Sequence, residues 1–182
     1  MAGEVSSALP RRRGRGRPLN WADVAVWIAA GMNSSRRWQL RKNLSPVRWL
    51  SGMRIEHVAP DFRSITAALR PRASRGGDDA AHTGAALYAL VDPCFLVIVQ
   101  HAVGPDYLVW DKAGSIEVLA PCRVRVWARL ELQDDDLRRI RQMTLSGDKH
   151  LHLFSVEMRD ADGMAIARIE KMIYVRKRGT ST

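Results

Sequence analysis

Two positions in the most apolar stretch of the chain could take part in chemistry. The stretch covers residues 80–103, and Asp92 is the one carboxylate inside it. A carboxylate in apolar surroundings is costly unless it is paired, protonated or used in a reaction. Gly84 lies near the start of the stretch, where the missing side chain lets another group approach exposed backbone amides. Asp92 is therefore a candidate acid or base, and Gly84 is a candidate contact for an anionic group.

Asp92 also has a purely structural interpretation, because Pro93 follows it. Aspartate at the N-cap followed by proline at the first helical position starts a helix. The apolar stretch would then be two helices with a joint at Asp92 rather than one helix. The sequence alone leaves both interpretations open.

Three histidines are further candidates. His82 precedes the expected helix, where it would either bind a substrate or close the loop; closing the loop is the simpler interpretation. His150 and His152 lie on the same side of an expected strand, and two such side chains are able to hold a metal ion. No third ligand follows at a suitable spacing, so no metal site is predicted.

Asp111 lies within another expected strand, next to Lys112. Alternation along a strand puts its side chain on the same face as Val109, Ala113 and Ser115. We therefore expect Asp111 to be a buried acid with an ionic partner rather than a catalytic group. The sequence contains no Gly-x-Ser-x-Gly nucleophile motif, phosphate-binding loop or dinucleotide-binding fingerprint.

The elements that would position these residues follow from the spacing of the apolar side chains. The stretch 80–103 predicts a helix that is buried on all sides. Further helices are predicted over residues 21–32, 34–44 and 134–145, and strands over residues 53–58, 64–72, 107–119, 123–132, 149–159 and 165–176. A long apolar helix between the second and third strands of an antiparallel sheet must lie across one face of that sheet. The predicted fold class is α+β, with the sheet wrapped around the central helix and with N-terminal helices.

Charge is unevenly distributed along the chain. Its 182 residues carry a net charge of +10, and residues 1–50 contain ten Lys or Arg residues against Glu4 and Asp23. We expect a disordered basic tail over residues 1–20, a helical extension over residues 21–50 and one domain over residues 51–178. The piece GRGRP in the tail resembles the core of an AT-hook, which inserts arginines into the minor groove of DNA. A solvated tail is the simpler interpretation.

The cysteines and the apolar stretch bear on where the protein is found. Cys94 and Cys122 form no Cys-x-x-Cys pair, which favours a reducing cytoplasm over a disulfide framework or a zinc ribbon. Residues 1–18 lack the apolar segment of a secretory signal. We expect the stretch 80–103 to be too short, and too interrupted at Asp92, to span a membrane. The sequence therefore predicts a cytoplasmic protein without a cofactor.

Four blocks of the chain together resemble an uncharacterised bacterial hotdog-fold family whose members are often labelled tetrameric acyl-CoA thioesterases. The blocks are SGMRIEHVAPDF at residues 51–62, HTGAALYALVDP at 82–93, GPDYLVWDKAGSIEV at 104–118 and ARIEKMIYVRK at 167–177. In hotdog thioesterases the central helix begins at a Gly-Gly pair whose backbone amide polarises the thioester carbonyl. An acid further along that helix, contributed at a dimer interface, acts as base or nucleophile. The resemblance implies Gly84 and Asp92 as the catalytic residues.

The same resemblance implies a set of substrate-binding residues and reveals two departures from the family pattern. The substrate-binding residues are His82, Thr83, Ala85, Tyr88 and Asp111. Ala85 stands where the second glycine of the pair is expected, and residues 73–79 contain no Asn of the kind that orients water in some related thioesterases. These departures favour, as an alternative, a non-catalytic hotdog module that binds an acyl or CoA-like ligand or only assembles.

The function implied by the resemblance is hydrolysis of an acyl-CoA or a similar thioester. Besides the non-catalytic module, the alternative is contact with nucleic acid through the arginines of residues 11–18. A lone sheet of this kind leaves one edge and one flank of the central helix uncovered. We therefore predict a homodimer or a tetramer.

Overall fold

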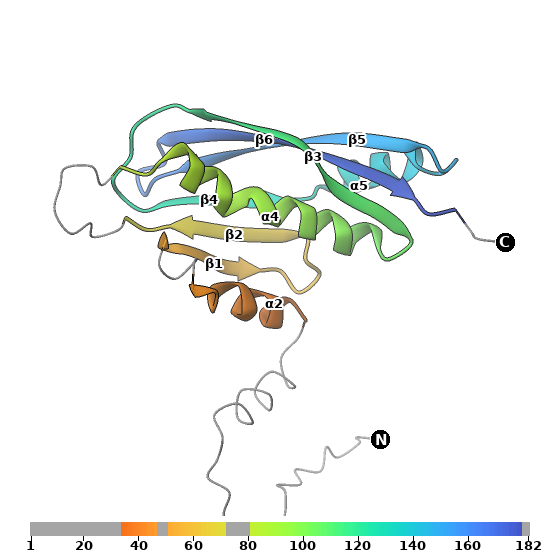
Figure 1. The fold of residues 1–182 in the computed structure, drawn as a ribbon, viewed down its shortest axis with the longest axis horizontal. Coiled ribbons are helices and arrows are strands. Elements are labelled where there is room, and N and C mark those ends of the chain that lie inside the picture. Colours follow the sequence, from red (N-terminus) through yellow and green to blue (C-terminus); the bar gives the residue numbers. More distant parts are fainter. Residues whose placement is uncertain (1–33, 47–50, 72–80, 180–182) are drawn as a thin grey trace, which may run out of the picture. The chain divides into compact units, whose positions relative to one another are not determined.

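Six antiparallel strands form one sheet with the order β1-β2-β4-β5-β6-β3 (Figure 1). They are β1 (Met53–Val58), β2 (Ser64–Leu69), β3 (Tyr107–Val118), β4 (Val126–Glu131), β5 (Lys149–Arg159) and β6 (Ala165–Lys177). The computed structural model describes residues 34–46, 51–71 and 81–179. The predicted tail, the predicted helix 21–32 and loop residues 73–79 lie outside the described residues. The α+β prediction, with the sheet wrapped around a central helix, is confirmed.

The central helix α4 (Gly84–Val103) runs without interruption through Asp92 and Pro93. Thr83 caps its start, because the side-chain oxygen accepts a hydrogen bond from the amide of Ala86. Gly104, with φ at 92°, ends it. The alternative of two helices joined at Asp92 is therefore wrong. Pro93 has no N–H to donate to the carbonyl of Ala89, and Ala89 is exposed, so water can reach that carbonyl.

One face of α4 packs on the sheet, and the opposite flank is not covered by the described part of the chain. The buried side chains recur at helical spacing: Leu87, Leu90, Val91, Cys94, Phe95, Ile98, Val99 and Val103. The other flank is exposed or half-buried at Gly84, Ala85, Tyr88, Ala89 and Asp92. Burial on all sides is thus wrong for the single chain. By length and composition alone α4 could cross a membrane, although the stretch 80–103 is expected from the sequence to be too short for this. In the structure the apolar face of α4 packs on the sheet.

A β-bulge in β3 changes which of its side chains face α4. The register pairs Asp111 with Ile173 but Ala113 with Met172, so Lys112 is the extra residue. Beyond the bulge Gly114 lies opposite Lys171, which puts Gly114 and Asp111 on the helix-facing side. The prediction that Ala113 shares a face with Asp111 is therefore wrong, because a one-residue slip moves every later side chain to the other face.

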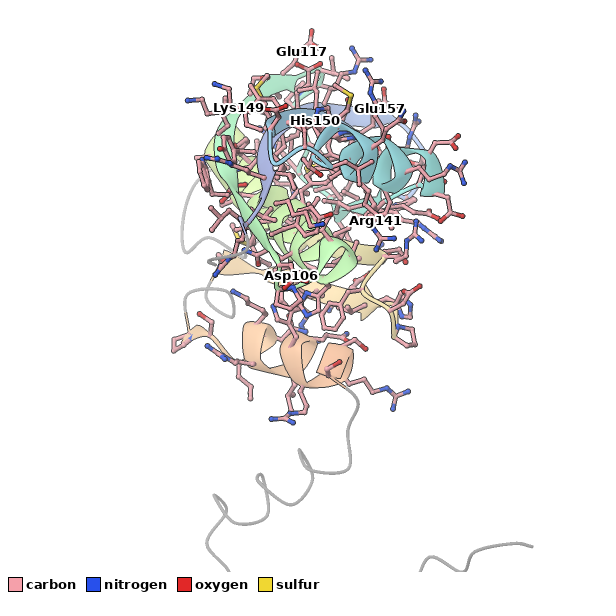
Figure 2. All side chains as sticks on the ribbon, turned by 90° about the vertical axis from the view of Figure 1, so that its right-hand side faces the viewer. Asp106, Glu117, Arg141, Lys149, His150 and Glu157 are labelled. Atoms are coloured by element: carbon pink, nitrogen blue, oxygen red, sulfur yellow. The ribbon has the colours of Figure 1, made fainter. Side chains whose placement is uncertain are left out.

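The outer face of the same strands carries a row of ion pairs. Arg168 on β6 lies opposite Glu117 on β3 and Glu157 on β5, and its guanidinium contacts both carboxylates at 3.6 and 3.2 Å. Figure 2 shows Glu117 and Glu157 at the same end of the domain. The hydrogen bond from Arg168, together with the charge of Arg159, lowers the pKa of Glu157. Such cross-strand pairs help to fix the register of the three strands.

The helix α2 (Ser34–Asn43) covers the free edge of β1. The Asn43 side chain accepts from the amide of Ile55 and donates to its carbonyl, both at 2.8 Å. Gln39 donates to the carbonyls of Ile55 and Glu56. Side chains thus replace the neighbouring strand that β1 lacks, which is one way to protect a sheet edge.

Replacing Asn43 by alanine is expected to destabilise the domain by about 1–3 kcal/mol, because two backbone groups of Ile55 lose their partners in a partly buried place. Urea unfolding followed by circular dichroism measures the change. Leu44→Ala is the matched control, since Leu44 is next along the chain and strongly exposed. Equal stability of the two variants would contradict the edge-covering role of Asn43.

The strands β4 and β5 are barely joined. Their register holds a single pair, Trp127 with Arg159, and α5 (Asp134–Met143) follows β4 directly.

β4 begins later than predicted, at Val126 rather than Arg123. Val124, which lies before the strand, is 53% exposed. The segment before β4 instead buries Cys122.

Candidate functional site

The start of α4 presents backbone amides for which the described residues provide no acceptor. Thr83 is the N-cap, and its side chain satisfies only the amide of Ala86. The amides of Gly84 and Ala85 belong to the first turn, where the helix itself supplies no acceptor. A methyl group added at Gly84 would meet Val118 at 3.5 Å, an ordinary contact. This helix end can therefore donate two hydrogen bonds to an oxygen anion.

His82 ties the segment before α4 to the segment before β4. Its amide donates to the carbonyl of Cys122 at 2.9 Å, and its Nε2 lies 2.7 Å from the carbonyl oxygen of Val124. These contacts match the loop-closing interpretation of His82. Its imidazole holds the start of α4 in place and makes no contact with Asp92 among the described interactions.

Tyr88, Asp92 and Asp111 meet around a residue that the sequence analysis missed, Lys171 of β6. Lys171 Nζ makes an ion pair and a hydrogen bond with Asp92 Oδ1. It lies 3.4 Å from Asp111 Oδ2 and donates to Tyr88 Oη at 3.2 Å. Lys171 is 3% exposed, whereas the Asp92 and Asp111 side chains are 39% and 33% exposed. A buried cation thus lies beneath two carboxylates that face solvent.

The charges in this cluster act on one another. Burial alone would lower the pKa of Lys171, but its hydrogen bonds to Asp92 and Tyr88 and the two carboxylate charges outweigh burial and raise that pKa. Lys171 therefore stays protonated. Burial raises the pKa of Asp111, and Lys171 opposes that rise while the charge of Asp92 adds to it. One ammonium between two carboxylates leaves the cluster with excess negative charge.

Gly114 leaves room for Tyr88. It lies opposite Lys171 on β3, and a methyl group there would overlap the Tyr88 hydroxyl and lie 3.1 Å from the carbonyl oxygen of Glu170. The bulge at Lys112 brings this glycine to the face that Tyr88 covers. The absence of a side chain thus lets the tyrosine reach Lys171.

The sequence does carry a signal for Lys171. In β6 the buried side chains alternate as Ile169, Lys171, Ile173 and Val175, so the lysine occupies a core position. A lysine is buried only where it is paired, and Asp92 and Asp111 are the two acids that needed a partner. Considering the three residues together would have predicted an ion pair between Lys171 and the two acids.

Gly84 and Asp92 of one chain lie on the same flank of α4 but far apart. Eight residues separate them, which corresponds to about 12 Å along a helix. An oxygen held at the amides and a water held by the carboxylate must both lie within about 3 Å of one carbonyl carbon. One copy of α4 therefore does not bring both groups to the same carbonyl.

His150 and His152 lie near a third group, Asp136 of α5. His152 Nε2 is 3.3 Å from Asp136 Oδ1, and His150 Nε2 is 3.4 Å from His152 Nδ1. Burial lowers the pKa of both histidines; Asp136 opposes this at His152, and Arg139 adds to it at both. Within residues 34–46, 51–71 and 81–179 no group of three or more His, Cys, Asp or Glu side chains has the arrangement of a metal site.

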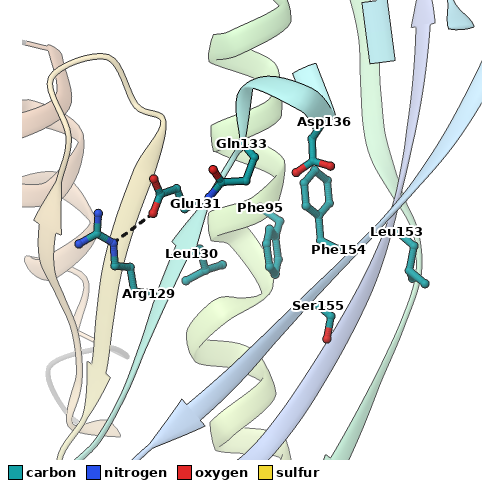
Figure 3. Close-up of a pocket in the computed structure, with 9 residues that line it drawn as sticks. All are labelled: Phe95, Arg129, Leu130, Glu131, Gln133, Asp136, Leu153, Phe154 and Ser155. Atoms are coloured by element: carbon teal, nitrogen blue, oxygen red, sulfur yellow. Dashed lines mark ion pairs between the residues drawn. The ribbon is translucent and has the colours of Figure 1, made fainter. Parts of the chain in front are cut away.

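A pocket of about 390 Å³ lies where β4 and β5 separate, and it is distinct from the Lys171 cluster. Figure 3 shows Phe95 and Phe154 reaching toward it from α4 and β5. Their rings stack with centroids 5.0 Å apart. None of the residues implied by the sequence resemblance lines this pocket or a second, more open one of about 600 Å³ at the C-terminal end of α4.

An antiparallel sheet wrapped around one long helix is the hotdog fold, and solved structures share it. A Pseudomonas aeruginosa protein of unknown function, described as a probable thioesterase, matches with a TM-score of 0.58 and 13% identity over 84% of this chain and 96% of that chain. A Haemophilus influenzae thioesterase matches with 0.56 and 11% over 80% and 92%. A Chlorobaculum tepidum protein of unknown function matches with 0.59 and 12% over 79% and 94%.

The family is shown by the sequence itself. Residues 40–175 match the model of DUF4442, a domain of unknown function. The chain belongs to this family, which agrees with the resemblance to an uncharacterised hotdog family. No curated protein is significantly similar to the chain. At identities of 11–13% the solved structures establish the fold alone.

Proposed function

We propose that the protein hydrolyses thioesters, with an acyl-CoA or a similar acyl thioester as substrate. The observation that carries the proposal is the outward-facing flank of α4, which combines the helix-start amides of Gly84 and Ala85 with the partly exposed carboxylate of Asp92. These are the two kinds of group that attack of water on an acyl carbonyl requires. The probable thioesterase and the thioesterase among the structural neighbours are consistent with this chemistry.

The reaction follows from these groups. The thioester carbonyl oxygen accepts hydrogen bonds from the amides at Gly84 and Ala85, which stabilise the negative charge that develops there. Asp92 takes a proton from water as the water oxygen bonds to the acyl carbon. The C–S bond then breaks, Asp92 returns its proton to the leaving sulfur, and the thiol and the carboxylic acid are released.

The site requires a second copy of the chain. Because Gly84 and Asp92 of one helix are about 12 Å apart, Gly84 of one copy must meet Asp92 of another. Two copies of α4 packed antiparallel along their exposed flanks, with a two-fold axis beside Tyr88, place residue 84 of each near residue 92 of the other. The edge of β3 opposite β6 lies next to this flank and has no partner strand in the described part of the chain, whereas α2 covers β1.

Removing the Gly84 amide tests the site without removing a side chain. Gly84→Pro is expected to lower kcat/KM about 10²- to 10³-fold, because proline fits the first position of a helix but has no N–H. Thr83, at ψ 150°, already has the extended backbone that a following proline needs. The matched control is Gly84→Ala, which keeps the amide and fits the space beside Val118. Hydrolysis is measured on a panel of acyl-CoAs of different chain lengths.

Mixing two inactive variants tests the shared site. In a mixed dimer of Gly84→Pro and Asp92→Asn chains, one site combines both defects and the other has neither. Random mixing is expected to restore about a quarter of the wild-type activity. No recovery after verified subunit exchange would contradict a site shared between copies. A wild-type protein that hydrolyses no thioester in the panel would overturn the proposed function and leave the non-catalytic module.

A further inference from the structure

The three hydrogen-bond donors of the Lys171 ammonium have three acceptors around them. Asp92 Oδ1 and Tyr88 Oη accept hydrogen bonds from Nζ, and Asp111 Oδ2 lies at 3.4 Å. The acceptors come from α4 and β3, and Lys171 comes from β6. Nζ is therefore held from three sides, and it contacts Asp92 through one oxygen, Oδ1. The other oxygen, Oδ2, has no partner among the interactions of the described residues.

A purely structural ion pair would not need this arrangement. Apolar side chains of similar size often stabilise a core as well as a buried ion pair does or better. Here the cation is buried at 3% exposure while both acids keep about a third of their surface in solvent. A second carboxylate also shares the lysine, so the charge of Asp92 is only partly balanced. Such a carboxylate is oriented by the lysine, and in the single chain it faces outward from the flank of α4 that the proposed second copy would meet.

We infer that Lys171 is the positioning residue for Asp92: it fixes the orientation of the carboxylate so that Oδ2, the oxygen not bound to Nζ, faces the attacking water. Asp111 is a second carboxylate partner of the ammonium and helps to hold Lys171 in place from β3. This inference rests on the proposed function. Asp92 is the catalytic residue, and Lys171 acts through Asp92.

The groups that face Asp92 from the packed elements are few. α4 contacts β2, β3, β4, β6 and α5. Tyr88, Asp111 and Lys171 are the titratable groups in the cluster, from α4, β3 and β6. The buried side chains of β2 and β4 are apolar. Asp136 of α5 pairs with His152 instead, and Arg141 of α5 donates to the carbonyl of Ala102, near the other end of α4.

The test compares the orientation of Asp92 and the kinetics of the full chain in wild type and in Lys171 variants. Lys171→Met removes the cation that holds Asp92 Oδ1, so its crystal structure is expected to show the Asp92 carboxylate in more than one orientation. The value of kcat is expected to fall about 10²-fold, the effect of a misplaced catalytic group, while KM changes little. Lys171→Arg keeps a cation at this place and is expected to retain more of kcat than Lys171→Met. Lys177→Met, an exposed lysine on the same strand, is the matched control.

A folded Lys171→Met protein with one unchanged orientation of Asp92 and a wild-type kcat would overturn the inference. Where Lys171→Met does not fold, Lys171→Gln decides, since a neutral side chain should hold Asp92 less firmly and lower kcat in the same way; a wild-type kcat would count against the inference. The crystal structure of the variant needs no substrate, so it tests Lys171 separately from turnover. Absence of turnover in wild type overturns the proposed function alone.

Discussion

Asp92→Asn is expected to reduce kcat/KM for thioester hydrolysis by about 10²- to 10⁴-fold, the usual contribution of a general base. Asparagine keeps the size of the side chain, and its amide oxygen can still accept a hydrogen bond from Lys171. What is lost is the ability to take a proton from water. Since Lys171 also keeps Asp111 and Tyr88 as partners, the fold should be retained.

The measurement is steady-state hydrolysis of the best acyl-CoA found for wild type, with circular dichroism to verify folding. Asp106→Asn is the matched control, because Asp106 is an exposed aspartate just before β3, away from the Lys171 cluster. It should keep the wild-type rate. If Asp92→Asn also keeps that rate, Asp92 is not the base.

Leu90→Ala is expected to lower the free energy of unfolding by about 2–5 kcal/mol. Leu90 is fully buried on the sheet-facing side of α4. Truncating it removes favourable burial of apolar surface and leaves a cavity that a close-packed core refills only in part. Urea unfolding at equilibrium, with the midpoint and slope fitted together, measures the loss.

Leu145→Ala provides the comparison, since Leu145 is 70% exposed. A surface truncation of this kind should change stability by less than about 0.5 kcal/mol. Equal losses for the two variants would mean that α4 does not form the core with the sheet. The variants need not be obtained in the same yield as wild type, because the urea unfolding curve does not depend on yield.

The parts of the fold that alternation or helical spacing governs could be predicted from the sequence. The limits of β1 (Met53–Val58) and β5 (Lys149–Arg159) agree with prediction to the residue. In these segments the alternation of the sequence and the burial in the folded chain both favour a strand over the same residues. Where other strand and helix ends differ from the prediction, they do so by one to four residues, with the largest difference at the start of α4, which is Gly84 rather than residue 80. End residues make few contacts that specify them.

The arrangement around Asp92 could be predicted only in part. The sequence identifies Asp92 and Asp111 as acids that need partners. It does not reveal the bulge at Lys112, which moves the later side chains of β3 to the opposite face of the sheet. That slip brings Gly114 rather than Ala113 to the helix-facing side. Lys171 was missed because each strand was read separately, whereas its partners come from α4 and β3. The spacing of apolar residues within one segment does not specify which distant segments it contacts.

The cover of α2 over β1 limits how many copies can join through their sheets. A sheet with two free edges allows the first strand of one copy to pair with the last strand of the next, and this head-to-tail contact has no natural end. In this chain Asn43 and Gln39 occupy the β1 edge. Within the described residues β3 is the other edge of the sheet, and a contact between two identical β3 edges would close after two chains. The short helix therefore favours a closed pair over a growing fibre.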